Sequence, residues 1–124
     1  MSDFNQPGDV FLADCPARLA VEIIADKWSV VVIYALSRGP RRHGELAELI
    51  GGISRKMLTQ TLRRLSAHGL VSRHAYAEVP PRVEYRLTEL GSTLIQPIQL
   101  LARWAEHNGT AVLDARETQG TRAS

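Results

Sequence analysis

The sequence has little of what disulfide-bonded and membrane proteins require. Its single cysteine, Cys15, excludes an intramolecular disulfide, and a reducing cytoplasm is then the expected compartment. No apolar run approaches the roughly 20 residues that a membrane-spanning helix needs. The N-terminal residues also lack the basic-then-apolar pattern of a signal peptide. We therefore expect a cytoplasmic protein without a membrane contact.

The patterns of catalysis and metal binding are missing as well. The four histidines have no metal-ligand spacing and no second cysteine to share an ion with them. The chain shows no nucleophile–base arrangement and no glycine-rich phosphate loop. We therefore expect neither an enzyme nor a cofactor.

Acidic residues are scarce in the middle of the chain. Residues 38–86 contain ten Lys or Arg and four Asp or Glu, a balance of +6, whereas the remaining residues contain five and nine, a balance of −4. The overall net charge of +2 conceals this separation. Such segregation favours a polyanionic partner.

Residues 54–69 contain no acidic residue at all and are predicted to form a helix with two different faces. Ser54 can cap its first turn, and Gly69 suits the left-handed position beyond its end. An apolar stripe recurs at helical spacing, formed by Leu58, Leu62 and Leu65 with Thr61 beside it. Side chains suited to phosphates and base edges occupy or flank the opposite side: Ser54, Arg55, Lys56, Thr59, Gln60, Arg63 and Arg64.

Three helices are predicted before this one. The first begins at Pro16 and ends near Asp26, and the second covers residues 27–37, where a run of β-branched residues makes a strand the alternative. The third covers residues 42–50, with Leu46, Leu49 and Ile50 pointing inward. Gly51-Gly52 separates it from the helix after Ser54. Two short helices joined by a tight turn form a helix-turn-helix, in which the second helix reads DNA.

A β-hairpin is predicted directly after that helix. Residues 70–76 and 83–87 have strand character, and a connection with two prolines and Arg82 joins them. A hairpin at this place is typical of a winged helix. A wing arginine commonly meets DNA, so Arg82 is a candidate contact, with pairing to Glu78 or Glu84 as the alternative. Contact of Arg41, Arg42 and His43 with phosphate is as well supported as simple solvation.

A long helix capped by Thr88 is predicted to complete the fold. Its apolar residues recur every three or four positions, Pro97 is expected to kink it, and Asn108-Gly109 to end it. The predicted organisation is a flexible arm at 1–13, one domain at 14–109 and a partly disordered tail at 110–124. The predicted fold class is mainly α with a small β-hairpin, a winged helix-turn-helix extended by N- and C-terminal helices.

Several blocks make residues 15 to about 105 closely similar to the HxlR-type winged helix-turn-helix regulators, which share the MarR architecture. These blocks are Cys15-Pro16, Asp26-Lys27-Trp28, Gly52-Ile53-Ser54, Lys56-Met57-Leu58-Thr59, Gly69-Leu70-Val71, Val79-Pro80-Pro81-Arg82-Val83-Glu84-Tyr85 and Leu87-Thr88-Glu89-Leu90-Gly91. The resemblance implies a homodimeric, DNA-binding repressor or activator whose first and last helices form the dimer. His43 departs from the family, which more often has Phe or Tyr there, so the packing of the third helix stays open.

The resemblance also implies that some members sense electrophiles, quinones or oxidants through the cysteine that matches Cys15. The start of a helix favours thiolate, although an isolated cysteine is often an inert buried residue. We therefore expect a regulator, favouring a repressor, that binds a palindromic operator as a homodimer through Leu94, Ile98 and Leu101. The alternatives are a protein-interaction winged helix and a regulator with a structural Cys15 and a non-covalent ligand, for example in a cavity near Trp28 and Trp104.

Overall fold

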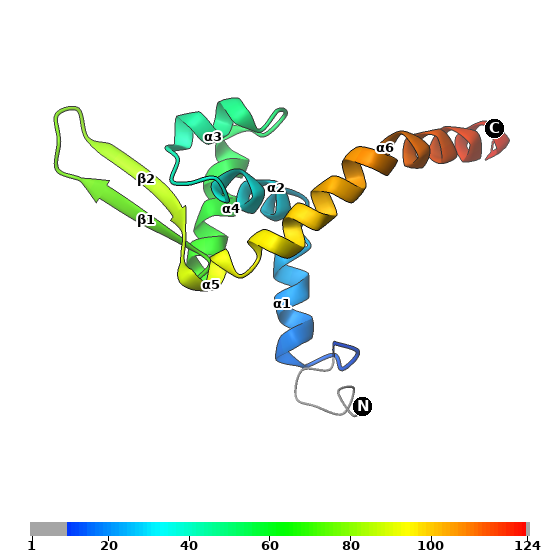
Figure 1. Ribbon diagram of the computed structural model, residues 1–124, viewed down its shortest axis with the longest axis horizontal. Helices are drawn as coiled ribbons and strands as arrows, with labels where there is room; N and C mark the ends of the chain where they lie inside the picture. The colour runs from blue at the N-terminus through cyan, green and yellow to red at the C-terminus, as the bar shows by residue number, and fades with distance from the viewer. Residues whose placement is uncertain (1–9, 124) are drawn as a thin grey trace.

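The computed structural model describes residues 10–123 and contains six helices and one hairpin in that part of the chain (Figure 1). Most of the predicted arm at 1–13 lies outside the described residues. The elements, in chain order, are α1 (Pro16–Ile24), α2 (Lys27–Leu36), α3 (His43–Leu49), α4 (Arg55–Ala67), β1 (Val71–Tyr76), β2 (Arg82–Leu87), α5 (Glu89–Ser92) and α6 (Ile95–Ala123).

The body of the molecule is built around α4. As predicted, the Ser54 side chain caps this helix by accepting a hydrogen bond from the Met57 amide at 3.0 Å. Gly69 follows the helix end with a φ of +76°, a conformation that residues with a Cβ rarely adopt. The predicted apolar stripe is buried and packs on residues of the neighbouring elements: Val32, Ile33, Leu36, Leu46, Val71 and Ile98.

Residues 27–36, for which a strand was the alternative, form the helix α2. The carboxylate of Asp26 connects the start of this helix to α4. Asp26 caps α2 by accepting from the Trp28 amide at 3.1 Å. The same side chain lies 2.8 Å from the guanidinium of Arg64, which also donates to the buried Ser29 hydroxyl. The guanidinium hydrogen bond lowers the pKa of Asp26, and the hydrogen bond from the backbone of Trp28 acts in the same direction. Asp26 therefore joins the start of α2 to the last turn of α4.

The hairpin has the predicted position and an antiparallel register in which Arg73 lies opposite Tyr85. A short bridge adds a third chain segment beside β2, because Arg41 and Tyr85 exchange two backbone hydrogen bonds of 2.9 and 2.8 Å. The hairpin is therefore fixed, near the middle of β2, to the segment that precedes α3. Its far end projects away from the helices (Figure 1).

The C-terminal helix differs from the prediction in two places. Thr88 caps only the four-residue α5, and a turn at residues 93–94 separates α5 from α6. Pro97 explains the break, because it cannot donate to the carbonyl of Thr93 and its ring would clash with that carbonyl in a continuous helix. In α6 itself Pro97 falls in the first turn, where its missing N–H has no helical partner to lose.

The predicted helix end at Asn108-Gly109 and the disordered tail were wrong. Helix α6 continues through Gly109 to Ala123, 29 residues that span about 44 Å at 1.5 Å per residue. Asn108 remains compatible with the helix because its side chain donates to the carbonyl of Trp104, one turn back. Figure 1 shows α1 and the distal part of α6 projecting from the body as separate arms.

Two further residues lie elsewhere than predicted. Leu49 is 54% exposed, because α3 ends there and only Leu46 and Ile50 reach the core. Ile98, expected in a dimer interface, is 3% exposed and belongs to the core of its own chain. The first turn of α6 thus serves the fold, and Ile98 has no surface left to offer a second copy.

Among the glycines that the structure describes, Gly91 is the one whose replacement is expected to meet the closest steric clash. A Cβ at this position would lie 2.0 Å from the carbonyl oxygen of Leu70, a backbone atom, so Gly91→Ala should lower the free energy of unfolding by about 3 kcal/mol. Gly109→Ala is the matched control, since it meets open space inside α6 and should raise stability by about 0.5–1 kcal/mol. Urea unfolding measures both variants, and an equal effect of the two would contradict this packing.

Asp26 is expected to make stability depend on pH. Because folding lowers the pKa of Asp26, the contribution of its carboxylate is present above the unfolded value of about 3.9 and is lost as pH falls through the folded value. Asn keeps the helix cap, so Asp26→Asn should cost about 1 kcal/mol at pH 7, allowing for a pair that is about one-third exposed. The difference from wild type should shrink at pH 3.

The exposed pair between Arg18 and Glu22 provides the control for Asp26. Glu22→Gln should change the free energy of unfolding by less than about 0.5 kcal/mol at either pH. Urea unfolding at pH 7 and pH 3 measures both variants. An Asp26→Asn difference that stays constant between these pH values would argue against the ionised pair.

Candidate nucleic-acid interface

Helices α3 and α4 form a helix-turn-helix whose turn contains Gly52 with a φ of +83°. Leu46 of α3 and Leu58 of α4 are both fully buried and belong to the same core cluster. A polar contact adds to this packing, because His43 Nε2 lies 3.0 Å from the hydroxyl oxygen of Thr59. The place of His43, where the family more often has an aromatic residue, is thus explained by a hydrogen bond that joins the two helices.

The outward face of α4 carries most of the predicted contact residues. The side chains of Arg55, Lys56, Gln60 and Arg63 are exposed, together with the capping Ser54. Within residues 10–120, none of these four long side chains takes part in an ion pair or a side-chain hydrogen bond. Thr59 is half-buried and engaged with His43. The outward face therefore presents two unpaired cations at the start of the helix and a third, Arg63, two turns further on.

Arg64 does not belong to this face. Its guanidinium is directed at α2, where it pairs with Asp26 and donates to Ser29. The sequence placed Arg64 at the edge of the basic face, but a partner 38 positions earlier in the chain determines its direction. We therefore remove Arg64 from the candidate contacts and treat it as a structural residue.

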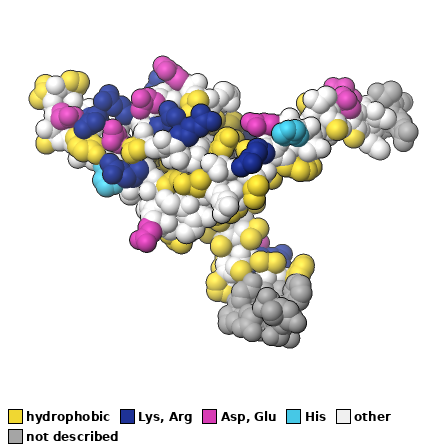
Figure 2. All heavy atoms as spheres, viewed as in Figure 1, with side chains coloured by type: hydrophobic (Ala, Val, Ile, Leu, Met, Phe, Trp, Pro, Cys, Tyr) yellow, Lys and Arg dark blue, Asp and Glu magenta, His cyan; other side chains and the backbone are white. Residues whose placement is uncertain are grey.

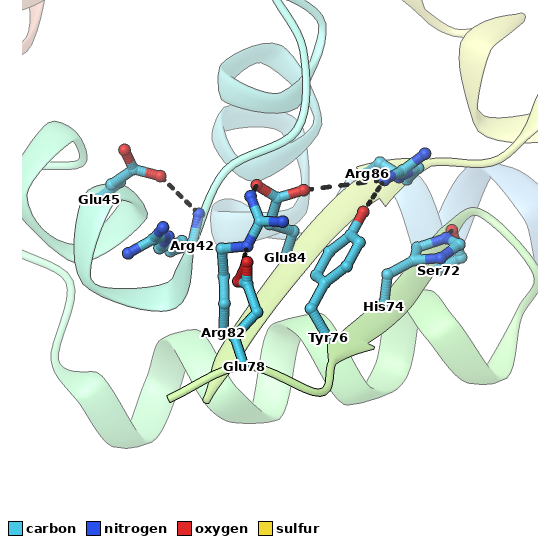
Figure 3. A network of polar contacts seen from close by, with 9 residues as sticks. All are labelled: Arg42, Glu45, Ser72, His74, Tyr76, Glu78, Arg82, Glu84 and Arg86. Atoms are coloured by element: carbon cyan, nitrogen blue, oxygen red, sulfur yellow. Dashed lines mark hydrogen bonds and ion pairs between the residues drawn. The ribbon is translucent and has the colours of Figure 1, made fainter. Parts of the chain in front are cut away.

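Arg82 lies within a network on one face of the hairpin rather than free at the tip (Figure 3). Its guanidinium is 2.9 Å from a carboxylate oxygen of Glu78 and 3.2 Å from one of Glu84, and it stacks on the ring of Tyr76 at 4.1 Å from the ring centre. Arg86 joins the network through Glu84 at 3.7 Å and the Tyr76 hydroxyl at 2.8 Å. The alternative of pairing with acidic neighbours describes Arg82 better than the predicted exposed contact.

Of the two arginines directly before α3, one is used within the chain and the other is exposed. Arg41 turns inward and donates from Nε to the carbonyl of Ala35 at 3.1 Å. Arg42 is exposed, and its backbone N–H donates to Glu45 at 2.7 Å, which closes the first turn of α3 (Figure 3). Figure 2 shows Lys and Arg side chains next to Asp and Glu side chains at this end of the molecule. Of these two arginines, only Arg42 presents its side chain to solvent.

Arg73 is a basic residue that the sequence reasoning did not single out. It lies in the middle of β1, and its exposed side chain lines a cleft between the hairpin and α4 that also contains Arg63. Within a strand, alternation alone predicts that Arg73 shares a face with Tyr85, its cross-strand partner. What the sequence lacked was a signal that this face turns toward α4.

The residues predicted for sensing and dimerisation lie at α1 and α6, and only some of them are on the projecting parts. Cys15 is the N-cap residue of α1 and is buried, 4% exposed, behind a turn that its amide closes onto the Leu12 carbonyl at 3.1 Å. Leu101 is exposed on α6, and Leu94 is half-buried against the core. No residue of α1 is buried, although Leu19 and Val21 are large and apolar.

Two other kinds of site, a metal centre and a membrane span, are not found among the described residues. Among the described residues, no three His, Cys, Asp or Glu side chains gather closely enough to hold a metal ion. No helix found there combines the length and apolar character required to cross a membrane. The outward face of α4 is the strongest candidate site because its exposed cations have no acidic partner within residues 10–120.

Comparison with known proteins agrees with this geometry. The uncharacterized HTH-type transcriptional regulator YtfH of Escherichia coli is 40% identical over 117 residues, which cover 94% of this chain and 93% of YtfH. The solved structure of the transcriptional regulator YtfH from Salmonella typhimurium has a TM-score of 0.75 at 39% identity and covers 86% of this chain and 96% of its own. The redox regulator HypR in its oxidized form has a TM-score of 0.71 at 38% identity, covering 76% and 97%.

The family model described as HxlR-like helix-turn-helix matches residues 23–112, most of the chain. The match includes α2 to α5, the hairpin and the first part of α6. The resemblance read from the sequence blocks is thereby confirmed, as is the winged helix-turn-helix fold. The chain belongs to the HxlR-like helix-turn-helix family and is a transcriptional regulator with a helix-turn-helix DNA-binding domain.

Proposed function

We propose that this protein is a homodimeric regulator, acting as a repressor, that recognises a palindromic operator in double-stranded DNA through the outward face of α4. The observation that carries the proposal is the set of unpaired Arg, Lys and Gln side chains on the second helix of a helix-turn-helix. Winged helices that bind other proteins usually lose the basic residues of this helix, whereas this chain retains Arg55, Lys56 and Arg63. A dimer bound at a promoter represses simply by occupying it.

The chemistry of α4 fits both parts of DNA recognition. Arg55 and Lys56 lie in the first turn, where side chains of a reader helix approach the major groove and its phosphates. Gln60 lies one turn further on and can pair with adenine through two hydrogen bonds. Ser54 is occupied as the cap, so its contribution is to fix the start of the helix.

The apolar surfaces of the two arms support a homodimer. Helix α1 contains no fully buried residue, and only its end, at Ile24, packs against the core of its own chain. The exposed apolar residues of α6 continue far beyond the core: Leu100, Leu101, Trp104, Val112 and Leu113. A single reader helix addresses one half-site, and two-fold symmetry supplies the second. We place Leu101 in the interface, with Leu94 at its edge and Ile98 outside it.

We further propose that oxidants or other electrophiles control DNA binding through Cys15. The thiol lies where the turn at residues 10–14 meets α1, one of the two arms assigned to the dimer. A covalent change there would displace that turn and reset the spacing of the two reader helices. The likeness to HypR, solved in an oxidized form and named a redox regulator, adds support.

Loss of charge on α4 should weaken DNA binding in a salt-dependent way. Each phosphate contact contributes about 0.9 to the slope of log K against log salt, so Lys56→Gln should reduce that slope by about 1.8 in a dimer. Gln60→Ala should cost about 1–3 kcal/mol on the operator and leave binding to random duplex unchanged. Fluorescence anisotropy on a duplex selected from genomic fragments measures both.

Arg116→Gln is the control for these variants, because it removes the same charge from the exposed distal part of α6. This variant should keep the wild-type slope and affinity. If Lys56→Gln and Gln60→Ala bind both duplexes as wild type does, α4 is not the reading element and the proposal is wrong.

Oxidation should change operator affinity only when Cys15 is present. Diamide treatment of the wild-type protein should shift affinity at least severalfold, reversibly on reduction, whereas Cys15→Ser should not respond. Alkylation measured with and without moderate urea should show that the buried thiol reacts faster once the turn opens. An equal response of wild type and Cys15→Ser would assign Cys15 a structural role and favour a non-covalent effector.

A further inference from the structure

A cleft of about 640 Å³ runs between α4 and the hairpin. Arginines from both sides enter its lining, Arg63 from the helix and Arg73 from β1. Hydroxyl and apolar side chains complete the lining, and no carboxylate is among them: Thr59, Leu62, Ser66, Ala67 and Tyr85. The cleft is therefore positively charged and has side-chain hydroxyls as well as guanidinium groups that can donate hydrogen bonds.

The arginines on the two faces of the hairpin differ in whether they have acidic partners. Strand alternation places Arg73 and Tyr85 on the face that lines the cleft, and Arg82, Glu84 and Arg86 on the other. On that other face both arginines lie within 4 Å of the Glu84 carboxylate (Figure 3). Their charge is thus largely neutralised inside the chain.

The cleft arginines have no such neutralisation. Within residues 10–120, neither Arg63 nor Arg73 takes part in an ion pair or a side-chain hydrogen bond. Two unpaired guanidinium groups on opposite walls of one cleft repel each other and attract an anion between them. The structure thus separates compensated arginines on the outer face from uncompensated ones in the cleft.

The position of the cleft identifies the anion. If α4 enters a major groove and the hairpin lies over the neighbouring minor groove, the ridge between the two grooves is one sugar–phosphate strand. That ridge must pass between α4 and the hairpin, and the cleft is the space between them. Guanidinium and hydroxyl groups are the side chains that commonly hold such a strand.

We infer that this cleft grips the DNA backbone between the two grooves, with Arg63 and Arg73 as phosphate contacts. The inference rests on the proposed function and deepens it in two respects. It assigns Arg73, which lies outside the reader helix, as a DNA-contact residue. It also assigns Arg63 to the backbone rather than to a base edge, so the cleft fixes the register of α4 while residues nearer its start read sequence.

The test is the salt dependence of Arg73→Gln on two duplexes, a 30-bp random-sequence duplex and the selected operator, by anisotropy between 50 and 300 mM KCl. A phosphate contact predicts that the log–log slope falls by about 0.9 per subunit, or about 1.8 per dimer, equally on both duplexes. The operator-to-random affinity ratio should stay at the wild-type value. Arg63→Gln should behave in the same way.

Two controls separate charge from fold. Arg73→Lys retains the point charge and should keep a slope close to that of wild type, whereas Arg116→Gln removes a charge outside the cleft and should leave the slope unchanged. Urea midpoints should match wild type in all variants, since Arg73 is exposed and makes no side-chain hydrogen bond within residues 10–120. A slope that falls in Arg73→Gln and is restored in Arg73→Lys supports the phosphate contact.

Two results would overturn the inference while the proposed function survives. One is a slope for Arg73→Gln equal to that of Arg116→Gln, with wild-type binding intact. The other is a loss of affinity on the operator alone, which would make Arg73 a base reader. Failure of the wild-type protein itself to bind either duplex at 50 mM KCl would instead reject the proposed function and, with it, the cleft.

Discussion

The burial of one stripe of α4 is the constraint on which the rest of the structure depends. Leu58, Leu62 and Leu65 are fully buried and fix the rotation of the helix about its axis. Once that rotation is set, the outward positions of Arg55, Lys56 and Gln60 follow from helical geometry alone. Burial of a leucine contributes about 1.5–3 kcal/mol, more than any exposed arginine contributes by pairing, so the apolar side decides and the basic side follows.

This hierarchy explains which features could be read from the sequence. The cap at Ser54, the left-handed Gly69 and the buried stripe are local signals, with their partners within one or two helical turns. The hairpin was predictable because residue type and turn composition are local as well. One family block has a physical meaning of the same kind, since the Thr88 side chain caps α5 by accepting from the Gly91 amide at 3.0 Å, three positions on.

Three of the errors have the opposite cause, a partner that is distant in the sequence. Arg64 is directed by Asp26, 38 positions away, and Ile98 belongs to a core that includes residues of α2, more than 60 positions earlier. Arg73 gained importance only when the hairpin placed its strand face opposite α4. The length of α6 was underestimated because Asn108-Gly109 is a plausible helix end in a free chain. Whether each arginine is paired or unpaired depends on its partners in the folded structure, whereas the composition gives only the net charge.

The contrast between paired and unpaired arginines has a consequence for how the domain holds DNA. Arg64 and Arg82 form ion pairs with carboxylates of their own chain. Arg64 joins α4 to α2, and Arg82 joins residues within the hairpin. Loss of either would loosen the elements that flank the cleft without removing a phosphate contact. Their effect on DNA binding would then appear in stability and in the spacing of α4 and the hairpin, whereas the phosphate contacts proposed for the unpaired arginines would act on the salt dependence itself.

The two projecting arms, α1 and the distal part of α6, bear on how two copies of the chain could assemble. A nine-residue helix with no buried residue and the exposed distal half of a 29-residue helix gain little from their own chain. Isolated helices shorter than about 12–15 residues are marginal in water, so α1 in particular requires a surface to cover it. If the second copy supplies that surface, the order of α1 depends on protein concentration and on the dimer. Cys15, the N-cap residue of that helix, then lies where a local chemical change would alter both folding of the arm and pairing of the subunits.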